Sequence, residues 1–558
     1  GDIGADGKLV LDAEGQVYQV NLLEKLLVPL LAKLGNLVID GGIWLNTQRP
    51  EWNDANNALV GQGLSMVTLY YMRRYMHFLR DLLGDEPGSF AVSAEVGLWL
   101  EGTASALSRT RSAAGNGHVD DDVRFGSLVE LGQVASDYRK AIYNSGGFAG
   151  SRDLEIRDIL ELLEDALVIT DHSIAANRRE DGLYDAYNVA DFDEDALRVD
   201  KLYPMLEGQV AVLSSGAIGA DEAADVLDAL FASDIYRDDQ ESFMLYPDRH
   251  LPGFLERNRV AEDQVQAIPL LSQMLKSGDE RVVLKDADGF VRFSAEFTNA
   301  GDIEAALDAI GDDYSENDSA TRKAILELYE SVFDHKSFTG RSGTMFGFEG
   351  LGSIYWHMVA KLMLAVEESF FNALDRGADH ATLKRLGDLY YRVRFGIGFN
   401  KSPADYGAFP TDPYSHTPRH AGAQQPGMTG QVKEEILTRF GELGVRVRDG
   451  AISIEPALLR AQEFSVEPKS FCYLDVDNSW QTLALPASSL AFTWCQVPIV
   501  YVLDDDAESG LVTEFDDGTH SNFTELNLPD DISTELFERS GRVRKIIATV
   551  GANRLFGN

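Results

Sequence analysis

The chain has 558 residues, far more than one hydrophobic core usually serves, so it should fold as two or more domains. Apolar residues make up 44% of the sequence, which is ordinary for a globular protein with a large core. The formal net charge of −41 gives a surface that repels nucleic acid and anionic membranes, so we expect neither as a partner.

The two cysteines, Cys472 and Cys495, are too few for a disulfide framework or a metal cluster. They could pair, but we expect reduced, buried thiols, as in a cytoplasmic protein. No apolar run reaches the ~18 residues that a membrane span needs, and no signal peptide is recognisable. The histidines also lack the spacing of metal ligands, so we expect no metal.

The chain up to residue 444 is predicted to be mostly helical. Helical apolar patterns cover residues 21–35, 64–83, 90–108, 126–144, 152–176, 221–231, 354–371, 380–395 and 429–443, with a strand-like stretch at 281–293. Long polar segments separate these patterns and no short repeat recurs. Both features favour a helical barrel with functional loops on one rim over a solenoid.

The pattern changes at Val445. Alternating and β-branched runs appear at 445–454, 470–475, 491–503 and 543–550, with turn residues between them. We therefore predict a helical domain over residues 1–444 and a small β domain over residues 445–558.

The stretch from Arg49 to Gly61 is the first candidate site. It holds two carboxyl groups, Glu51 and Asp54, the Trp52 indole and several amides. A carboxyl group here could protonate a leaving group, the indole could stack on a sugar, and the amides could bind hydroxyls. The stretch precedes a helix whose predicted apolar face consists of Leu64, Val67, Tyr71, Tyr75, Phe78 and Leu82. The alternative interpretation is that its Asp and Asn residues only cap this helix.

Residues 335–350 are the second candidate site. They combine His335, Arg341 and Ser342 with several glycines just before an apolar helix. Glycines let backbone N–H groups approach an anion, and a helix N-terminus favours negative charge. The alternative is a flexible loop without a ligand, and the order of residues is not that of a P-loop.

Residues 424–433 are the third candidate site, a Gly-containing turn into a helix. Thr429 could cap that helix with its hydroxyl group and also meet an anion at the same end. The alternative is a plain helix cap. We find no nucleophile elbow and no Cys–His pair that would indicate covalent catalysis.

Taken together, four stretches resemble the inverting phosphorylases of glycoside hydrolase family 94 and the related family 149. They are Pro50–Gly61, Tyr203–Leu213, Tyr406–Ser415 and Met428–Pro456. The last is the most specific, since its Thr-Gly helix start, Gly441–Gly444 turn and Asp449-Gly450 strand match in order and spacing. The divergent loops favour family 149, whose members act on β-1,3-oligoglucans.

The resemblance implies an (α/α)6 barrel followed by a β-sandwich or jelly-roll-like domain. It implies cleavage of β-glucosidic oligosaccharides by inorganic phosphate, with release of α-glucose 1-phosphate and without a cofactor. Asp54 would be the general acid. The family places a β-sandwich domain and about half of the barrel helices before this acid, so the chain resembles a C-terminal half that needs its N-terminal half. The family also implies a homodimer.

The resemblance further assigns binding roles. Thr429 and Gly430 would hold phosphate, and His335, Arg341 or Ser342 would replace the family's phosphate-binding histidine, which is absent from residues 341–356. The residues expected to bind substrate are Trp52, Asn53, Glu349, Asp412, Tyr414 and Gln431. Two alternatives stay open: an inverting hydrolase with Glu349 or Glu434 as its base, and a non-catalytic carbohydrate-binding half-protein.

Overall fold

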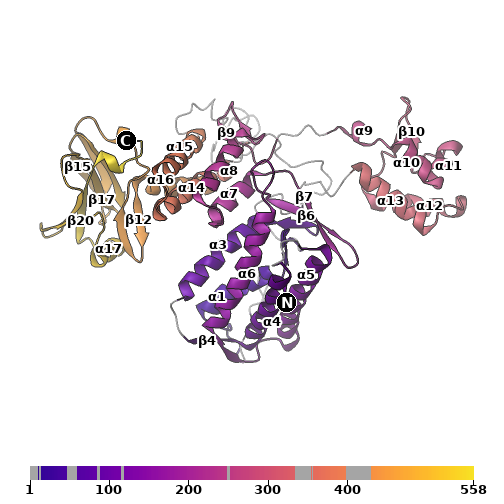
Figure 1. The fold of residues 1–558 in the computed structure, drawn as a ribbon, viewed down its shortest axis with the longest axis horizontal. Coiled ribbons are helices and arrows are strands. Elements are labelled where there is room, and N and C mark those ends of the chain that lie inside the picture. The colour runs from indigo at the N-terminus through magenta and orange to yellow at the C-terminus, as the bar shows by residue number, and fades with distance from the viewer. Residues whose placement is uncertain are drawn as a thin grey trace. The chain divides into compact units, whose positions relative to one another are not determined.

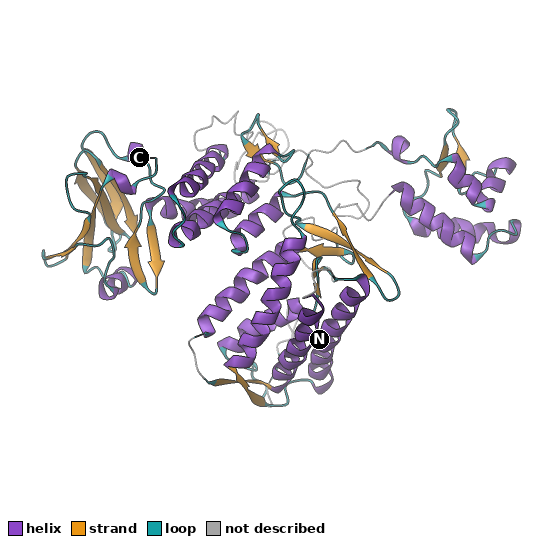
Figure 2. Ribbon diagram, in the orientation of Figure 1, coloured by secondary structure: helices purple, strands orange, loops and turns teal. Residues whose placement is uncertain are grey.

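The computed structural model describes residues 10–11, 14–46, 59–84, 88–114, 119–247, 252–333, 354, 356–397 and 429–557 (Figure 1). The chain divides into two compact units, Gly1–Gly208 with Tyr246–Ser353, and Gln209–Leu245 with Ile354–Asn558. Figure 2 shows helices through most of the chain and strands gathered in its C-terminal part. This confirms a mainly helical chain with a β domain. The six-fold barrel and the boundary after residue 444 stay predictions.

Helices form the body of the first unit. They are α1 (Leu22–Leu34), α3 (Met66–Leu83), α4 (Ala94–Ala114), α5 (Asp121–Ser145) and α6 (Ile156–Ala176), and α7 (Leu206–Ser215) crosses into the second unit. Asn21 caps α1, because its side chain accepts a hydrogen bond from the Glu24 N–H. α4 packs against α1, α5 and α6, and α6 also packs against α3.

An antiparallel sheet completes this part of the unit. Its strands, in spatial order, are β1 (Leu37–Val38), β2 (Gly42–Trp44), β3 (Gly63–Ser65), β6 (Tyr187–Phe192) and β7 (Leu197–Lys201). The β6–β7 hairpin lies in an acidic stretch that the sequence did not identify as strand. Its turn residues Asp193–Asp195 interrupt two runs that are short and only partly alternating, so the strand pattern is weak.

Two predicted helix starts are wrong. Strands β4 (Ser89–Ser93) and β5 (Ser151–Glu155) pair with each other, and only then do α4 and α6 begin. The apolar residues of each strand continue the apolar pattern of the helix that follows it in sequence. The strand with which each one pairs lies about 60 residues away in the chain. Local periodicity therefore could not separate strand from helix.

α3 buries a different face from the predicted one. Its buried apolar residues are Met66, Leu69, Tyr70, Met72, Met76, Leu79 and Leu83. Phe78 and Leu82, which we placed on the buried face, are 56% and 52% exposed. Apolar residues recur at helical spacing on both sides of this segment, so packing against α6 selects the face and periodicity does not.

Residues 252–333 have a hydrophobic core of their own, which includes Leu271, Val283, Phe293, Leu307 and Tyr329. The elements are α9 (Phe254–Arg257), α10 (Glu262–Ala267), α11 (Pro269–Ser277), β10 (Val283–Lys285), β11 (Val291–Phe293), α12 (Ala300–Ile310), η1 (Gly311–Asp313) and α13 (Ser319–Phe333). The β10–β11 hairpin confirms the strand-like stretch that the sequence predicted at 281–293.

The second unit begins with helices. They are the end of α7, α8 (Ala220–Ala232), α14 (Trp356–Asp375), α15 (His380–Gly396) and α16 (Thr429–Leu443), with the short hairpin β8 (Tyr236–Arg237) and β9 (Ser242–Phe243). α14 packs against α8, α15 and α16. Asp379 caps α15 by accepting a hydrogen bond from the Thr382 N–H at 2.9 Å.

Strands dominate the rest of this unit. They are β12 (Val445–Arg448), β13 (Ala451–Ile454), β14 (Lys469–Leu474), β15 (Trp480–Leu485), β16 (Ser489–Trp494), β17 (Val497–Leu503), β18 (Gly510–Phe515), β19 (His520–Phe523) and β20 (Val543–Val550), with η4 (Ala461–Glu463), α17 (Asp530–Phe537) and η5 (Ala552–Arg554). The five-stranded sheet has the order β16-β17-β20-β18-β19. β17 and β20 run parallel, so this sheet is mixed and departs from the expected antiparallel jelly roll.

A tight turn joins α16 to this β region. Gly444 has φ +78°, and a Cβ there would lie 2.3 Å from the Glu455 backbone carbon, so the position requires glycine. Asp449 and Gly450, at φ 50° and 82°, form the two-residue turn of the β12–β13 hairpin. The most specific sequence run thus corresponds to a helix, a turn and a hairpin.

Two further expectations concern the whole chain. In the part of the chain that the structure describes, no helix is long and apolar enough to cross a membrane. Cys472 and Cys495 are both free thiols, as predicted, but Cys472 is exposed because it lies on the β14–β15 hairpin.

Candidate functional site

Most of the predicted site residues lie outside the described residues. They are Trp52, Asn53, Asp54, His335, Arg341, Ser342, Glu349, Asp412 and Tyr414. Thr429, Gly430 and Gln431 form the first turn of α16, but their side chains are also outside the described part. The structure therefore tests none of these roles. It does show which contacts hold the strands and helices that flank the predicted site residues in sequence.

The segment 47–58, which carries the predicted acid, is bracketed by β2 and β3. The Leu45 N–H donates to the Gly63 carbonyl at 2.9 Å, and the Gly61 N–H donates to the Leu45 carbonyl at 2.7 Å. The Trp44 indole N–H adds a hydrogen bond to the Gly61 carbonyl at 3.0 Å. The residues on the two sides of the segment are thus hydrogen-bonded to each other at the end of the β2–β3 ladder.

The start of α3 follows directly. Ser65 is the cap, since its Oγ accepts a hydrogen bond from the Thr68 N–H at 3.1 Å. The Met66 and Val67 N–H groups donate to the Ala186 carbonyl at 3.0 and 3.2 Å. The alternative interpretation of the preceding Asp- and Asn-rich stretch as the cap of this helix is therefore wrong.

Buried polar contacts hold β6 beside this helix start. The Tyr187 hydroxyl donates to Glu207 Oε2 at 2.7 Å, and both side chains are buried. The Tyr70 hydroxyl, on α3, donates to the Asp185 carbonyl at 3.0 Å. Burial, with the nearby Asp185 charge, raises the Tyr70 pKa well above its usual value, so this donor stays protonated. Glu207 lies in one of the four stretches that carried the family resemblance.

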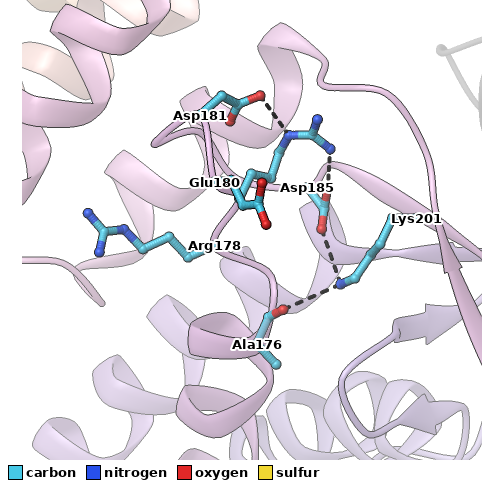
Figure 3. Close-up of a pocket in the computed structure, with 7 residues that line it drawn as sticks. Ala176, Arg178, Glu180, Asp181, Asp185 and Lys201 are labelled. Carbon is cyan, nitrogen blue, oxygen red and sulfur yellow. Dashed lines mark hydrogen bonds and ion pairs between the residues drawn. The ribbon is translucent and has the colours of Figure 1, made fainter.

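A charged pocket of about 440 Å³ opens beside the same strand (Figure 3). Its lining consists of Ala176, Arg178, Arg179, Glu180, Asp181, Asp185 and Lys201. The Asp185 side chain, only 3% exposed, lies between Arg179 Nη1 at 2.9 Å and Lys201 Nζ at 3.1 Å. Three cationic and three anionic side chains balance in this lining, whereas the chain as a whole is strongly acidic.

The hydrogen bonds of the pocket keep its charges fixed. Burial disfavours the charged form of Arg179, but its hydrogen bonds to Asp185 and Asp181 outweigh this effect and raise its pKa. The backbone of the Glu180–Gly182 turn closes through the Arg179 N–H, which donates to the Leu183 carbonyl at 2.8 Å. We did not single out these residues from sequence, because their pairing depends on a contact between β7 and the end of α6.

In the second unit, a buried carboxylate connects α15 and α16. Glu442 is 1% exposed and accepts hydrogen bonds from the Tyr390 hydroxyl at 2.6 Å and Arg439 Nη1 at 2.5 Å. Arg394 Nε lies 2.7 Å from the same carboxylate. These contacts balance its charge and hold the C-terminal end of the helix that begins at Thr429.

A second carboxyl group, Glu367 on α14, packs against the backbone of α16. A Cβ at Gly441 would lie 1.9 Å from its Oε1, so only glycine leaves room for this side chain. Burial, and secondarily the charge of Glu442, raises the Glu367 pKa from 4.5 to about 9. Glu367 is therefore a neutral acid at pH 7.

Of the two residues named as the base of a hydrolase, the structure describes Glu434 but not Glu349. Glu434, on α16, is 4% exposed and lies in the packed part of the second unit, while Glu349 falls outside the described residues. The sequence did not reveal the carboxyl cluster of Glu367 and Glu442. The available signal was a carboxyl group at position 367 inside an otherwise strongly apolar helix.

Comparison with known protein families identifies one segment of the chain. Residues 251–336 match the family model described as GH149 phosphorylase insertion domain 2. This match relates the segment 251–336 to an insertion domain of the GH149 phosphorylases. The matched range coincides with the segment 252–333, whose separate core is described above. No curated protein matches the chain.

The match supports a class of enzyme, but it does not identify the reaction or the substrate. A GH149 phosphorylase domain indicates an enzyme of the glycoside phosphorylase type. Of the residues that we assigned to the site, the matched range contains His335 alone. The likeness to family 94 and the assignment to a C-terminal half stay predictions.

Proposed function

We propose that the protein catalyses the inverting phosphorolysis of β-glucosidic oligosaccharides, β-1,3-oligoglucans in the first place. Inorganic phosphate is the second substrate and α-glucose 1-phosphate is the product. The observation that carries the proposal is the GH149 phosphorylase insertion domain at residues 251–336. It agrees with the resemblance of the four stretches on which the sequence analysis rests.

In this reaction Asp54 acts as the general acid and protonates the glycosidic oxygen as the bond breaks. Trp52 and Asn53 line the sugar. An inverting hydrolase needs a second carboxylate to activate water, but phosphate is itself the nucleophile. One carboxylic acid therefore suffices, and the protein must mainly fix the phosphate in line with the breaking bond.

The phosphate is held by Thr429 and Gly430 at the start of α16. We add His357 to the proposed site, because it directly follows residues 341–356, in which the family's phosphate-binding histidine was sought. It stands in the first turn of α14 and is partly buried. A helix start places N–H groups and the positive end of the helix dipole toward an anion.

The test is cleavage of laminari-oligosaccharides and cello-oligosaccharides with and without inorganic phosphate. Phosphate-dependent glucose 1-phosphate is the expected product, with laminari-oligosaccharides preferred. Asp54→Asn should lower kcat by about 10²- to 10⁴-fold, the usual contribution of a general acid. Asp388→Asn is the matched control, since this carboxylate on α15 is 55% exposed and pairs only on the surface with Lys384.

His357→Ala should raise the KM for phosphate more than the KM for the oligosaccharide. Equal release of free glucose without phosphate would replace the proposal by the hydrolase alternative. Absence of any product from both oligosaccharide series would overturn the proposed substrate class.

A further inference from the structure

The pocket residues belong to a network that reaches the backbone before β2 and after β3, on the two sides of the segment 47–58. Lys201 Nζ donates to Asn177 Oδ1 at 2.6 Å and also pairs with Asp185. Asn188 Nδ2 donates to the same Asn177 oxygen at 2.8 Å and to the Gly41 carbonyl at 2.9 Å. Gly41 directly precedes β2, so the network holds the strand that leads into the segment.

The same network holds the strand and helix that follow the segment. Asp185 is fixed by Arg179 and Lys201, and the next residue, Ala186, supplies the carbonyl for the Met66 and Val67 N–H groups. Tyr187 then pairs with Ser65 in the ladder between β3 and β6. A change in the position of the Asp185 backbone is therefore passed to the end of β3 and the first turn of α3.

These contacts are buried and strong enough to set a position. Asn177 and Asn188 are both 0% exposed and Asp185 is 2% exposed. Their partners are charged or fully enclosed, and hydrogen bonds of this kind are the stronger ones in proteins. Lys201 is the accessible member, since its side chain is 41% exposed at the rim of the pocket (Figure 3).

We propose that Asp185, Lys201 and Asn177 are positioning residues that hold the backbone at Gly41, before β2, and at the start of α3, after β3. Through these two flanking elements they would place the segment that carries Asp54. The inference rests on the proposed function for its catalytic consequence. None of these residues touches the substrate. Their loss should change the rate of the chemical step, because a displacement of about 1 Å of a catalytic group can lower a rate about 100-fold.

The principal variant is Lys201→Met, which removes both the Asp185 and the Asn177 contact and keeps the length of the side chain. The control is Arg198→Met on the same strand, an exposed cation that pairs with Asp191 on β6 and touches neither Asp185 nor Asn177. Both variants remove one positive charge from the same hairpin, so their comparison isolates the network from the general effect of charge.

The first measurement is steady-state kinetics of oligosaccharide phosphorolysis. Lys201→Met should lower kcat about 10-fold to 100-fold, with the KM values for phosphate and oligosaccharide within 2-fold of wild type. Lys201→Arg should restore most of kcat, and Arg198→Met should keep it. Equal kcat values for Lys201→Met and Arg198→Met would overturn the proposal, as would a loss that appears only in KM.

The second measurement does not need activity. Hydrogen exchange of a peptide that covers residues 59–70 should become faster in Lys201→Met, at the Met66 and Val67 amides, and stay unchanged in Arg198→Met. Unchanged exchange in both variants would refute the positioning role even if the enzyme is an active phosphorylase. Faster exchange in a protein without phosphorolysis would refute the proposed function and leave the role of the network in fixing β3 and α3 intact.

Discussion

Glu367→Gln should stabilise the protein, although the residue is buried and its neighbours are charged. In the folded state the Glu367 pKa is about 9, whereas in the unfolded chain it has its ordinary value of 4.5. Between these two values the folded state binds a proton that the unfolded state has released. The free energy of unfolding therefore falls as pH rises, by about 1.4 kcal/mol per pH unit.

The magnitude follows from the same two values. At pH 7 the pH lies about 2.5 units above the Glu367 pKa of the unfolded chain, while the folded state still holds the proton. The acid therefore lowers stability by about 3 kcal/mol relative to a group that does not titrate. Glutamine has nearly the same shape as glutamic acid and has no side-chain group that titrates in this pH range. Glu367 is 6% exposed, so little solvent screens this effect. The penalty is absent below pH 4.5 and reaches its full size above pH 9.

The assay is urea unfolding of wild type and Glu367→Gln at pH 6, 7 and 8. The difference in unfolding free energy between them should favour the variant and widen by about 1.4 kcal/mol for each pH unit. Asp388→Asn, an exposed carboxylate on the neighbouring α15, is the control and should follow wild type in parallel. Parallel lines for Glu367→Gln and wild type would show that Glu367 has an ordinary pKa and would refute the reasoning.

Three further predictions test the fold. Ser65→Ala removes the cap of α3 and should lower the free energy of unfolding, measured in urea, by about 1 kcal/mol; an unchanged value would mean that Ser65 does not stabilise the helix start. Gly444→Ala should destabilise by more than about 1 kcal/mol in chemical denaturation, because φ is +78° and the Cβ would meet the Glu455 backbone; an effect near zero would mean that the turn can relax. Leu79→Ala should cost about 2–5 kcal/mol and Leu82→Ala less than about 1 kcal/mol, since only Leu79 is buried, and the reverse order would restore the face predicted from sequence.

Sequence reasoning was accurate where a local pattern has one structural solution. The predicted helices at 380–395 and 429–443 correspond to α15 and α16, and the change of pattern at Val445 corresponds to β12. It failed where two solutions share a pattern. The stretches before α4 and α6 have a helical pattern in sequence but pair with each other as β4 and β5. The sequence also does not show which of the two apolar sides of α3 packs against α6.

The candidate site divides in the same way. The sequence alone supplied the residue types for an acid, a sugar platform and a phosphate site, and it supplied the family resemblance, which the insertion domain at 251–336 supports. Only the tertiary structure brought Asp185, Lys201, Asn177 and Asn188 together beside β6 and β7. It also brought Glu367 close enough to Glu442 for the charge of Glu442 to raise the Glu367 pKa. Such groups lie on different elements, and their pKa values and partners depend on burial and distance, which no local pattern encodes.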